Sequence, residues 1–216
     1  MATLLHIDTS LNGENSHSRA VTAAFRKAWQ SEHPQGRVIY RDLDTDPVPH
    51  LRAAAYYAGY TAPAEQSPEE RAAFALRAQL IEEAEAADVI LLGAPMHNYS
   101  IPSTLKAWLD HVFTVGRTAM TEAPSLAGKP AVVVTSRGGS YQEGTPQHGN
   151  DYVQSYLRQA LGTGLGLDVT FIVPELTMAP TVPAMAGLVP LFEASRTASL
   201  AAAESHAREL VTRPAA

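Results

Sequence analysis

The sequence predicts one α/β domain in which helices cover both faces of a five-stranded parallel sheet. Short, almost continuous apolar runs, bounded by polar or turn residues, are typical of buried parallel strands. Helical patterns, with apolar residues three and four positions apart, lie between these runs. Because strands and helices alternate along the chain, the connections must be crossovers and the sheet parallel. The length of 216 residues suits one domain over residues 1–216.

Three strong runs and two weaker runs define the expected strands. The strong runs are residues 4–7, 89–93 and 131–135. The weaker runs, residues 38–40 and 169–173, are expected nearer the edges of the sheet. Five strands in this arrangement favour the flavodoxin-like strand order 2-1-3-4-5.

Periodicity and capping residues predict the helices that connect these strands. Ser16 and Ser18 are good caps for the first helix. Ser67 and Pro68, followed by two glutamates, combine an N-cap, a proline in the first turn and acidic first-turn residues. The expected helices cover residues 18–30, 68–87, 102–113, 151–161 and 191–211.

The stretch over about residues 46–66 is too long for a simple connection. It has two prolines early in its length and Tyr56, Tyr57 and Tyr60 in its middle. Long insertions of this kind often act as lids or binding loops, so we expect it to cover the active site. The tyrosines either cover an aromatic substrate or are buried under the insertion, and the sequence favours neither interpretation.

Composition and charge exclude several classes of function. Sixteen basic residues against 22 acidic residues give a net charge of −6, and no basic run could follow a nucleic-acid backbone. The amino terminus lacks the features of a signal peptide, and no uncharged stretch is long and apolar enough to span a membrane. We therefore expect a cytoplasmic protein without nucleic-acid or membrane partners. No metal is expected, because the chain has no cysteine and no metal-binding histidine spacing. The absence of a serine hydrolase motif excludes that class of enzyme.

Three polar loops follow strands where an open α/β sheet binds ligands, at the point where the strand order reverses. The first loop, residues 8–18, is rich in hydroxyl groups and leads into a helix, which makes a neutral cradle for a dianionic phosphate. It matches neither the phosphate loop of nucleotide hydrolases nor the dinucleotide fingerprint, which favours a mononucleotide held in place. Ser16 and Ser18 suit simple helix caps equally well.

The other two loops have the composition of a binding site for a heteroaromatic ring. The second loop, residues 94–106, mixes amide, aromatic and thioether groups. His97 in this loop suits a general base, but an exposed loop histidine is the simpler interpretation. The third loop, residues 135–141, contains Gly138 and Gly139, which permit positive φ and close approach of the backbone to a ligand. A plain turn is the alternative for these glycines.

The three loops together resemble a known family, the FMN-dependent NADH:azo/quinone oxidoreductases, commonly called FMN-dependent azoreductases. The resemblance extends over most of the chain. It is carried by the run 94–110 and by Ser10, Ser16-His17-Ser18 and Ser136-Arg137-Gly138-Gly139. It implies a flavodoxin-like fold, a homodimer and the passage of hydride from NADH or NADPH, through FMN, to quinones and azo compounds.

The resemblance also implies which residues bind the cofactor, while no amino acid is needed as a catalytic acid or base because the flavin carries the redox chemistry. The FMN phosphate would be held by Ser10, Ser16, His17 and Ser18. The ribityl chain and isoalloxazine would run along Pro95, Met96, His97, Asn98 and Tyr99. The ring would be edged by Ser136, Arg137, Gly138 and Gly139. One pocket over the flavin is too small for both substrates together, so we expect ping-pong exchange.

Two positions depart from the family pattern. His97 stands where the family usually has tyrosine, a contact that the backbone can make. An aromatic residue of the family is missing near Ala119, which predicts an open entrance to the flavin pocket. The alternative functions are a flavodoxin-type electron carrier without small-molecule turnover and a flavin-free binding module. The long insertion and the mixed loop around His97 favour the enzyme.

Overall fold

Five parallel strands form the centre of the computed structural model, which describes residues 1–210. The sheet has the order β2-β1-β3-β4-β5, and every pairing is parallel, which confirms the predicted topology. Each strand lies within two residues of its predicted run, and the two weaker runs form the edges. The strands are β1 (Thr3–Asp8), β2 (Arg37–Asp42), β3 (Val89–Gly93), β4 (Pro130–Val134) and β5 (Asp168–Ile172).

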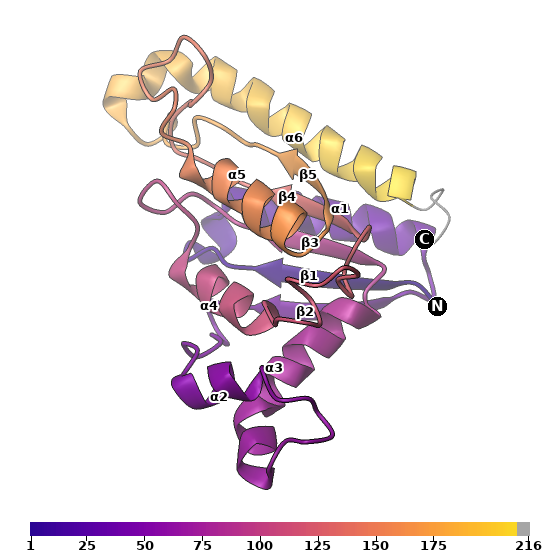
Figure 1. The fold of residues 1–216 in the computed structure, drawn as a ribbon. Helices are drawn as coiled ribbons and strands as arrows, with labels where there is room; N and C mark the ends of the chain where they lie inside the picture. Colours follow the sequence, from indigo (N-terminus) through magenta and orange to yellow (C-terminus); the bar gives the residue numbers. More distant parts are fainter. Residues whose placement is uncertain (211–216) are drawn as a thin grey trace.

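Helices lie on both faces of this sheet, with α1 and α6 side by side on one face (Figure 1). The three helices expected first agree with the structure within two residues. The α-helices are α1 (His17–Glu32), α2 (Ala53–Ala58), α3 (Pro68–Ala86), α4 (Ser103–Val112), α5 (Tyr152–Leu157) and α6 (Val189–Glu209). Short segments of other helix types are Gly13–Asn15 and Pro183–Leu188, both 3₁₀, and Arg158–Gly164, which is π-helical.

Two of the predicted helices differ from the structure. The helix expected over residues 151–161 is α-helical only to Leu157, and a π-helical turn follows. Gly164 ends this turn in close contact with Phe113, since a Cβ at this glycine would lie 2.6 Å from the Phe113 ring. The helix expected over residues 191–211 begins earlier, at Val189, because proline fits the first helical turn. Its predicted end at Val211 lies outside the described residues.

The core consists of two apolar layers, one on each face of the sheet. Successive side chains of a strand point to opposite faces. Leu5 and Ile7 therefore join the layer under α3, α4 and α5, whereas Leu4 joins the layer under α1 and α6. A fully buried tryptophan anchors each layer, Trp108 in the first and Trp29 in the second. Because both faces are covered, β3 and β4 have no polar side chain and β1 is largely apolar, which is why the sequence marks these strands so clearly.

The insertion before α3 contains the short helix α2, which the sequence did not predict. Arg77 of α3 fastens it, because its buried guanidinium donates to the backbone oxygen of Ala55 and to that of His111 in α4. Tyr56, Tyr57 and Tyr60 are between 44% and 67% exposed, so their burial under the insertion is excluded. Their covering of an aromatic substrate stays a prediction.

Among residues 1–210, no helix has both the length and the apolar character needed to cross a lipid bilayer.

Candidate functional site

A cavity of about 300 Å³ lies at the carboxyl end of the sheet. Its walls come from the loops that follow β1, β3, β4 and β5. Chain order reverses between β1 and β3, so this cavity lies where open α/β sheets bind ligands. It is lined by Ser10, Asn12, Ser16, His17, Pro95, Met96, His97, Asn98, Ser136, Gly138, Thr177 and Met178.

Nine of the thirteen residues that the resemblance implies for cofactor binding line this cavity. The four that do not are Ser18, Tyr99, Arg137 and Gly139. Three further residues of the wall were not predicted: Asn12, Thr177 and Met178. The last two reach the site because their N–H groups bond to the backbone oxygens of residues 137 and 138, at 3.1 and 3.2 Å.

The first loop presents hydroxyl groups to the cavity at the start of α1. Ser16 is the N-cap, and its Oγ accepts the N–H of Arg19 at 3.2 Å, so the cap interpretation is confirmed for this residue. The Oγ of fully buried Ser18 lies 3.1 Å from the Oγ of Ser16. Ser16 thus both caps the helix and lines the cavity. Ser18 does not line the cavity, and its hydroxyl contacts that of Ser16.

This end of the cavity fits a phosphate group held by neutral donors. The first N–H groups of a helix, here those of His17 and Ser18, have no acceptor within the helix, and the helix dipole favours an anion beside them. Hydroxyl groups of Ser10 and Ser16 lie in the same wall, and none of its described residues is a lysine or arginine. Helix N–H and hydroxyl donors can hold a phosphate monoester such as that of FMN.

The second loop makes a tight turn that carries backbone strain. His97 and Ser100 exchange two backbone hydrogen bonds, at 2.9 and 3.0 Å. The two residues between them, Asn98 and Tyr99, have φ of 50° and 68°, the left-handed pair of a type I′ turn. Asparagine tolerates this conformation, but tyrosine adopts it rarely. Strain of this kind is characteristic of ligand-binding loops.

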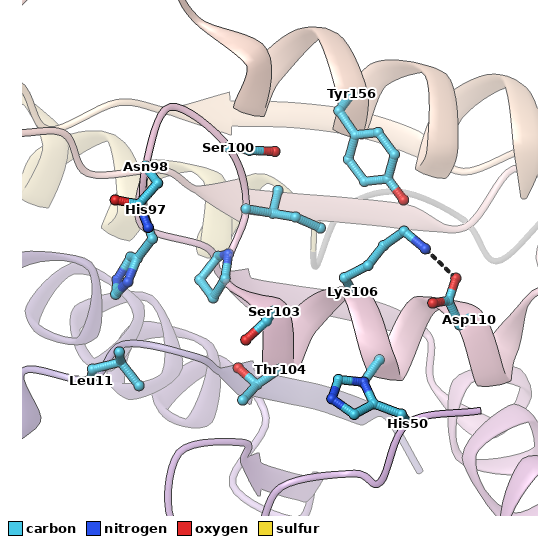
Figure 2. A pocket seen from close by; sticks show the side chains of 13 residues that line it. Leu11, His50, His97, Asn98, Ser100, Ser103, Thr104, Lys106, Asp110 and Tyr156 are labelled. Carbon is cyan, nitrogen blue, oxygen red and sulfur yellow. Dashed lines mark hydrogen bonds and ion pairs between the residues drawn. The ribbon is translucent and has the colours of Figure 1, made fainter. Parts of the chain in front are cut away.

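A second cavity of about 580 Å³ adjoins the first, because His97 and Asn98 line both. Figure 2 shows its remaining wall, where Lys106 of α4 pairs with Asp110, and Tyr156 and His50 stand on either side. Burial lowers the pKa of His97 below its usual value. The imidazole at the junction of the two cavities is therefore neutral near pH 7.

Gly138 in the third loop is required for close packing. Gly138 and Gly139 permit positive φ, but neither adopts it. A Cβ at Gly138 would lie 2.5 Å from the Sδ of Met178, so the absence of a side chain lets this methionine pack against the loop and line the cavity. Nothing lies closer than 4.0 Å to a Cβ at Gly139.

Arg137 is directed into the protein and not into the cavity. Its side chain is 3% exposed, and Nη1 donates to Asp151 at 2.7 Å while Nε lies 3.7 Å from Glu175. Glu175 in turn accepts the hydroxyl of Ser140 at 3.1 Å. Burial would raise the pKa of Asp151, but hydrogen bonds from Gln154 and the charge of Arg137 hold it below its usual value. Arg137 thus ties the third loop to the start of α5 and to the loop after β5.

The expectation that position 119 borders the flavin pocket is wrong, while an open entrance to that pocket stays a prediction. Ala119 is 3% exposed and belongs to the apolar layer under α3, α4 and α5. The hydroxyl of Thr118 donates to the backbone oxygen of Val112 at 2.5 Å and accepts the N–H of Thr114 at 2.9 Å. These bonds hold the segment against the end of α4, so the side chain at position 119 points into the core.

Comparison with known proteins gives relatives over the whole chain. The FMN-dependent NADH:quinone oxidoreductase of Streptomyces coelicolor is 60% identical over 214 residues, which cover 99% of this chain and 97% of that protein. The protein of the same name from Streptomyces avermitilis is 56% identical over 217 residues and covers 100% of both. A family model described as a flavodoxin-like fold matches residues 2–182.

Solved structures share the fold at lower identity. The azoreductase from Bacillus anthracis str. Sterne superposes with a TM-score of 0.80 at 22% identity, covering 97% of this chain and 100% of that one. An FMN-dependent NADH-azoreductase from Bacillus anthracis str. Ames Ancestor, in complex with FMN, superposes with a TM-score of 0.75 at 20% identity, covering 96% and 100%. With the fold, the family model and the Streptomyces relatives in agreement, the chain belongs to the flavodoxin-like family of FMN-dependent NADH:quinone oxidoreductases.

Proposed function

We propose that this protein oxidises NADH and reduces quinones and azo compounds with FMN as its cofactor. The observation that supports this most is the cavity at the β1/β3 switch point, where loops distant in sequence bring hydroxyl and helix N–H donors together with the apolar side chains of Met96 and Met178. A flavodoxin-type electron carrier is not favoured, because the Streptomyces relatives are named as quinone oxidoreductases. The homodimer and the cytoplasmic location stay predictions.

Different residues of the cavity wall bind different parts of the cofactor. We assign the phosphate to the hydroxyls of Ser10 and Ser16 and to the start of α1, and the ring system to Met96, Asn98 and the backbone beside Gly138. When bound, the flavin supplies the redox chemistry by accepting a hydride from the nicotinamide and passing it to the acceptor. The protein contributes binding, orientation and N–H donors fixed before the reaction begins.

The adjoining cavity of about 580 Å³ provides space for a small aromatic substrate next to His97 and Asn98. Nicotinamide and quinone both require contact with the flavin, and this space suits one ring system at a time. The two substrates therefore enter in turn.

Two measurements test the proposed function. The purified protein is expected to show the visible absorption spectrum of bound flavin and to oxidise NADH continuously, beyond one equivalent per flavin, only when a quinone is present. Double-reciprocal plots for NADH at several quinone concentrations are expected to be parallel. A protein that binds no flavin would contradict the cofactor assignment, and a flavin-containing protein without NADH turnover would support the electron carrier. Intersecting plots would exclude ping-pong exchange.

The pH dependence of FMN binding is expected to report on His17. Burial and the charge of Arg196 lower the pKa of His17, and this residue lines the cavity at the start of α1. A bound phosphate dianion favours the imidazolium and raises the pKa of His17. At pH values between the pKa of the free protein and that of the FMN-bound protein, binding therefore takes up a proton. The affinity of the wild type relative to His17→Gln should therefore rise as the pH falls from about 8 to about 6. This ratio cancels the titration of FMN itself. Titrations by flavin fluorescence measure it, and a constant ratio would remove His17 from the phosphate site.

A further inference from the structure

We infer that Arg19 is a positioning residue for the phosphate end of the site, where it fixes the Ser10 carbonyl and, through it, the hydroxyl-bearing loop. Arg19 lies in the first turn of α1 and does not line the cavity. The inference rests on the proposed function, because the loop matters in this way only when it holds a phosphate.

The guanidinium of Arg19 is committed at all five of its N–H groups. Nε and Nη2 donate to the backbone oxygen of Ser10, at 3.3 and 2.8 Å. Nη1 and Nη2 donate to the two carboxylate oxygens of Asp42, both at 2.7 Å. The remaining Nη1 proton faces the phenol oxygen of Tyr40 at 3.3 Å. No donor is left over for a ligand.

Arg19 also contacts the second cradle residue through its own backbone. Its N–H donates to the Oγ of Ser16 at 3.2 Å. One residue therefore holds the peptide that follows Ser10 and the hydroxyl orientation of Ser16. The loop segments around Ser10 and Ser16, which must converge on one phosphate, are thus both fixed to Arg19. Supporting contacts of this kind set the precision of a binding site.

A hydrogen-bonded network around buried Asp8 holds the partners of Arg19 in place. Asp8 and Asp42 are register neighbours at the ends of β1 and β2. Buried Asp8 accepts the hydroxyl of Thr22 at 2.9 Å and the phenol of Tyr40 at 3.2 Å. Burial and the two carboxylates raise the pKa of Tyr40 to about 12, so the phenol remains a donor to Asp8 and an acceptor for Arg19 at physiological pH. The carboxyl ends of β1 and β2 therefore hold the guanidinium of Arg19 in a fixed position.

A matched ion pair supplies the control for this role. Arg41 pairs with Glu83 through a two-bond contact like that of Arg19 with Asp42. The side-chain exposures are also similar, 14% and 18% against 16% and 19%. Arg41 points away from the first loop and donates to α3. Loss of Arg41 therefore costs a comparable ion pair without disturbing the cradle.

The first test compares Arg19→Met with Arg41→Met in titrations of the flavin-free protein with FMN and with riboflavin. We expect Arg19→Met to raise the Kd for FMN about tenfold or more, because bonds to the charged phosphate lose their geometry. Its Kd for riboflavin, which lacks the phosphate, should change less than about threefold. Arg41→Met should leave both constants within about threefold. Equal losses for both ligands, or no loss, would overturn the inference.

The second test uses Asp42→Asn, which keeps the side-chain shape and releases Arg19 from a charged partner. If Arg19 positions the loop, this variant binds FMN more weakly, by about threefold or more, with riboflavin unchanged. If Arg19 instead binds the phosphate directly, the freed guanidinium binds FMN more tightly, and the inference fails. A wild-type protein that binds neither ligand would contradict the proposed function, whereas FMN binding insensitive to both variants would contradict only the role of Arg19.

Discussion

Replacement of Arg137 by methionine is expected to lower the free energy of unfolding by about 3 to 5 kcal/mol. The guanidinium lies between two largely buried carboxylates, Asp151 at 2.7 Å and Glu175 at 3.7 Å. Its removal leaves two negative charges in a poorly solvated place without their cation. Urea denaturation at pH 7 measures the loss. Among the substitutions considered, this one should affect stability most, although Arg137 does not itself line the cavity.

Arg196→Met provides the control, because Arg196 forms an exposed ion pair with Glu193 at 3.6 Å. That variant should lose no more than about 1 kcal/mol. The effect at Arg137 should also depend on pH. A carboxylate whose pKa is lowered in the folded state, as that of Asp151 is, stabilises the fold above its unfolded pKa and stops doing so as the pH falls through the folded value. The difference between wild type and Arg137→Met should therefore shrink below about pH 4. Equal losses of unfolding free energy in both variants would mean that the buried ion pairs of Arg137 stabilise the fold no more than the exposed pair of Arg196.

Valine at Gly138 is expected to reduce FMN affinity about tenfold or more, a loss of about 1.4 kcal/mol. A Cβ at this position would lie 2.5 Å from Sδ and 2.8 Å from Cγ of Met178. The methionine must then leave its place, and because it lines the cavity, the wall changes shape. Met178 is half exposed and flexible, so it can move without unfolding the protein. The flavin content of the purified protein and the Kd for FMN measure the effect.

Gly139→Val is the paired control for this substitution. Nothing lies within 4.0 Å of a Cβ at Gly139 except the ring of Tyr141 at that distance, and its φ is not positive. We expect this variant to bind FMN within about threefold of the wild type. If both valine variants retain FMN equally, the packing of Met178 against Gly138 is irrelevant to the site, and the third loop acts only as a turn.

The sequence predicted the sheet well because burial on both faces leaves a local mark. The run at residues 89–93 coincides with β3, whose side chains are all buried. The candidate site was also visible, since polar loops after buried strands must meet at the carboxyl edge of a parallel sheet. Ser10 and Ser136 are far apart in the chain, yet they line one cavity. Their convergence follows from the topology alone.

What the sequence missed depends on contacts without a local pattern. Thr177 and Met178 reach the cavity through backbone hydrogen bonds to the third loop, and such bonds leave no trace in residue type. Arg137 resembles a ligand-binding residue until its partner Asp151 is known, and that pairing spans a loop without secondary structure. Ala119 is buried because Thr118 bonds to the end of α4, which spacing could not indicate.

The turn between His97 and Ser100 also bears on the heat stability of the chain. Position 99 has φ of 68°, a conformation that costs a residue with a Cβ roughly 1 to 2 kcal/mol and costs glycine almost nothing. Selection for heat resistance alone would favour an Asn-Gly pair in such a turn. This chain has tyrosine there, with its ring about half exposed and with Asn98 and Ser100, its neighbours in sequence, in the wall of the second cavity. Tyr99→Gly would therefore be expected to make the fold more resistant to heat.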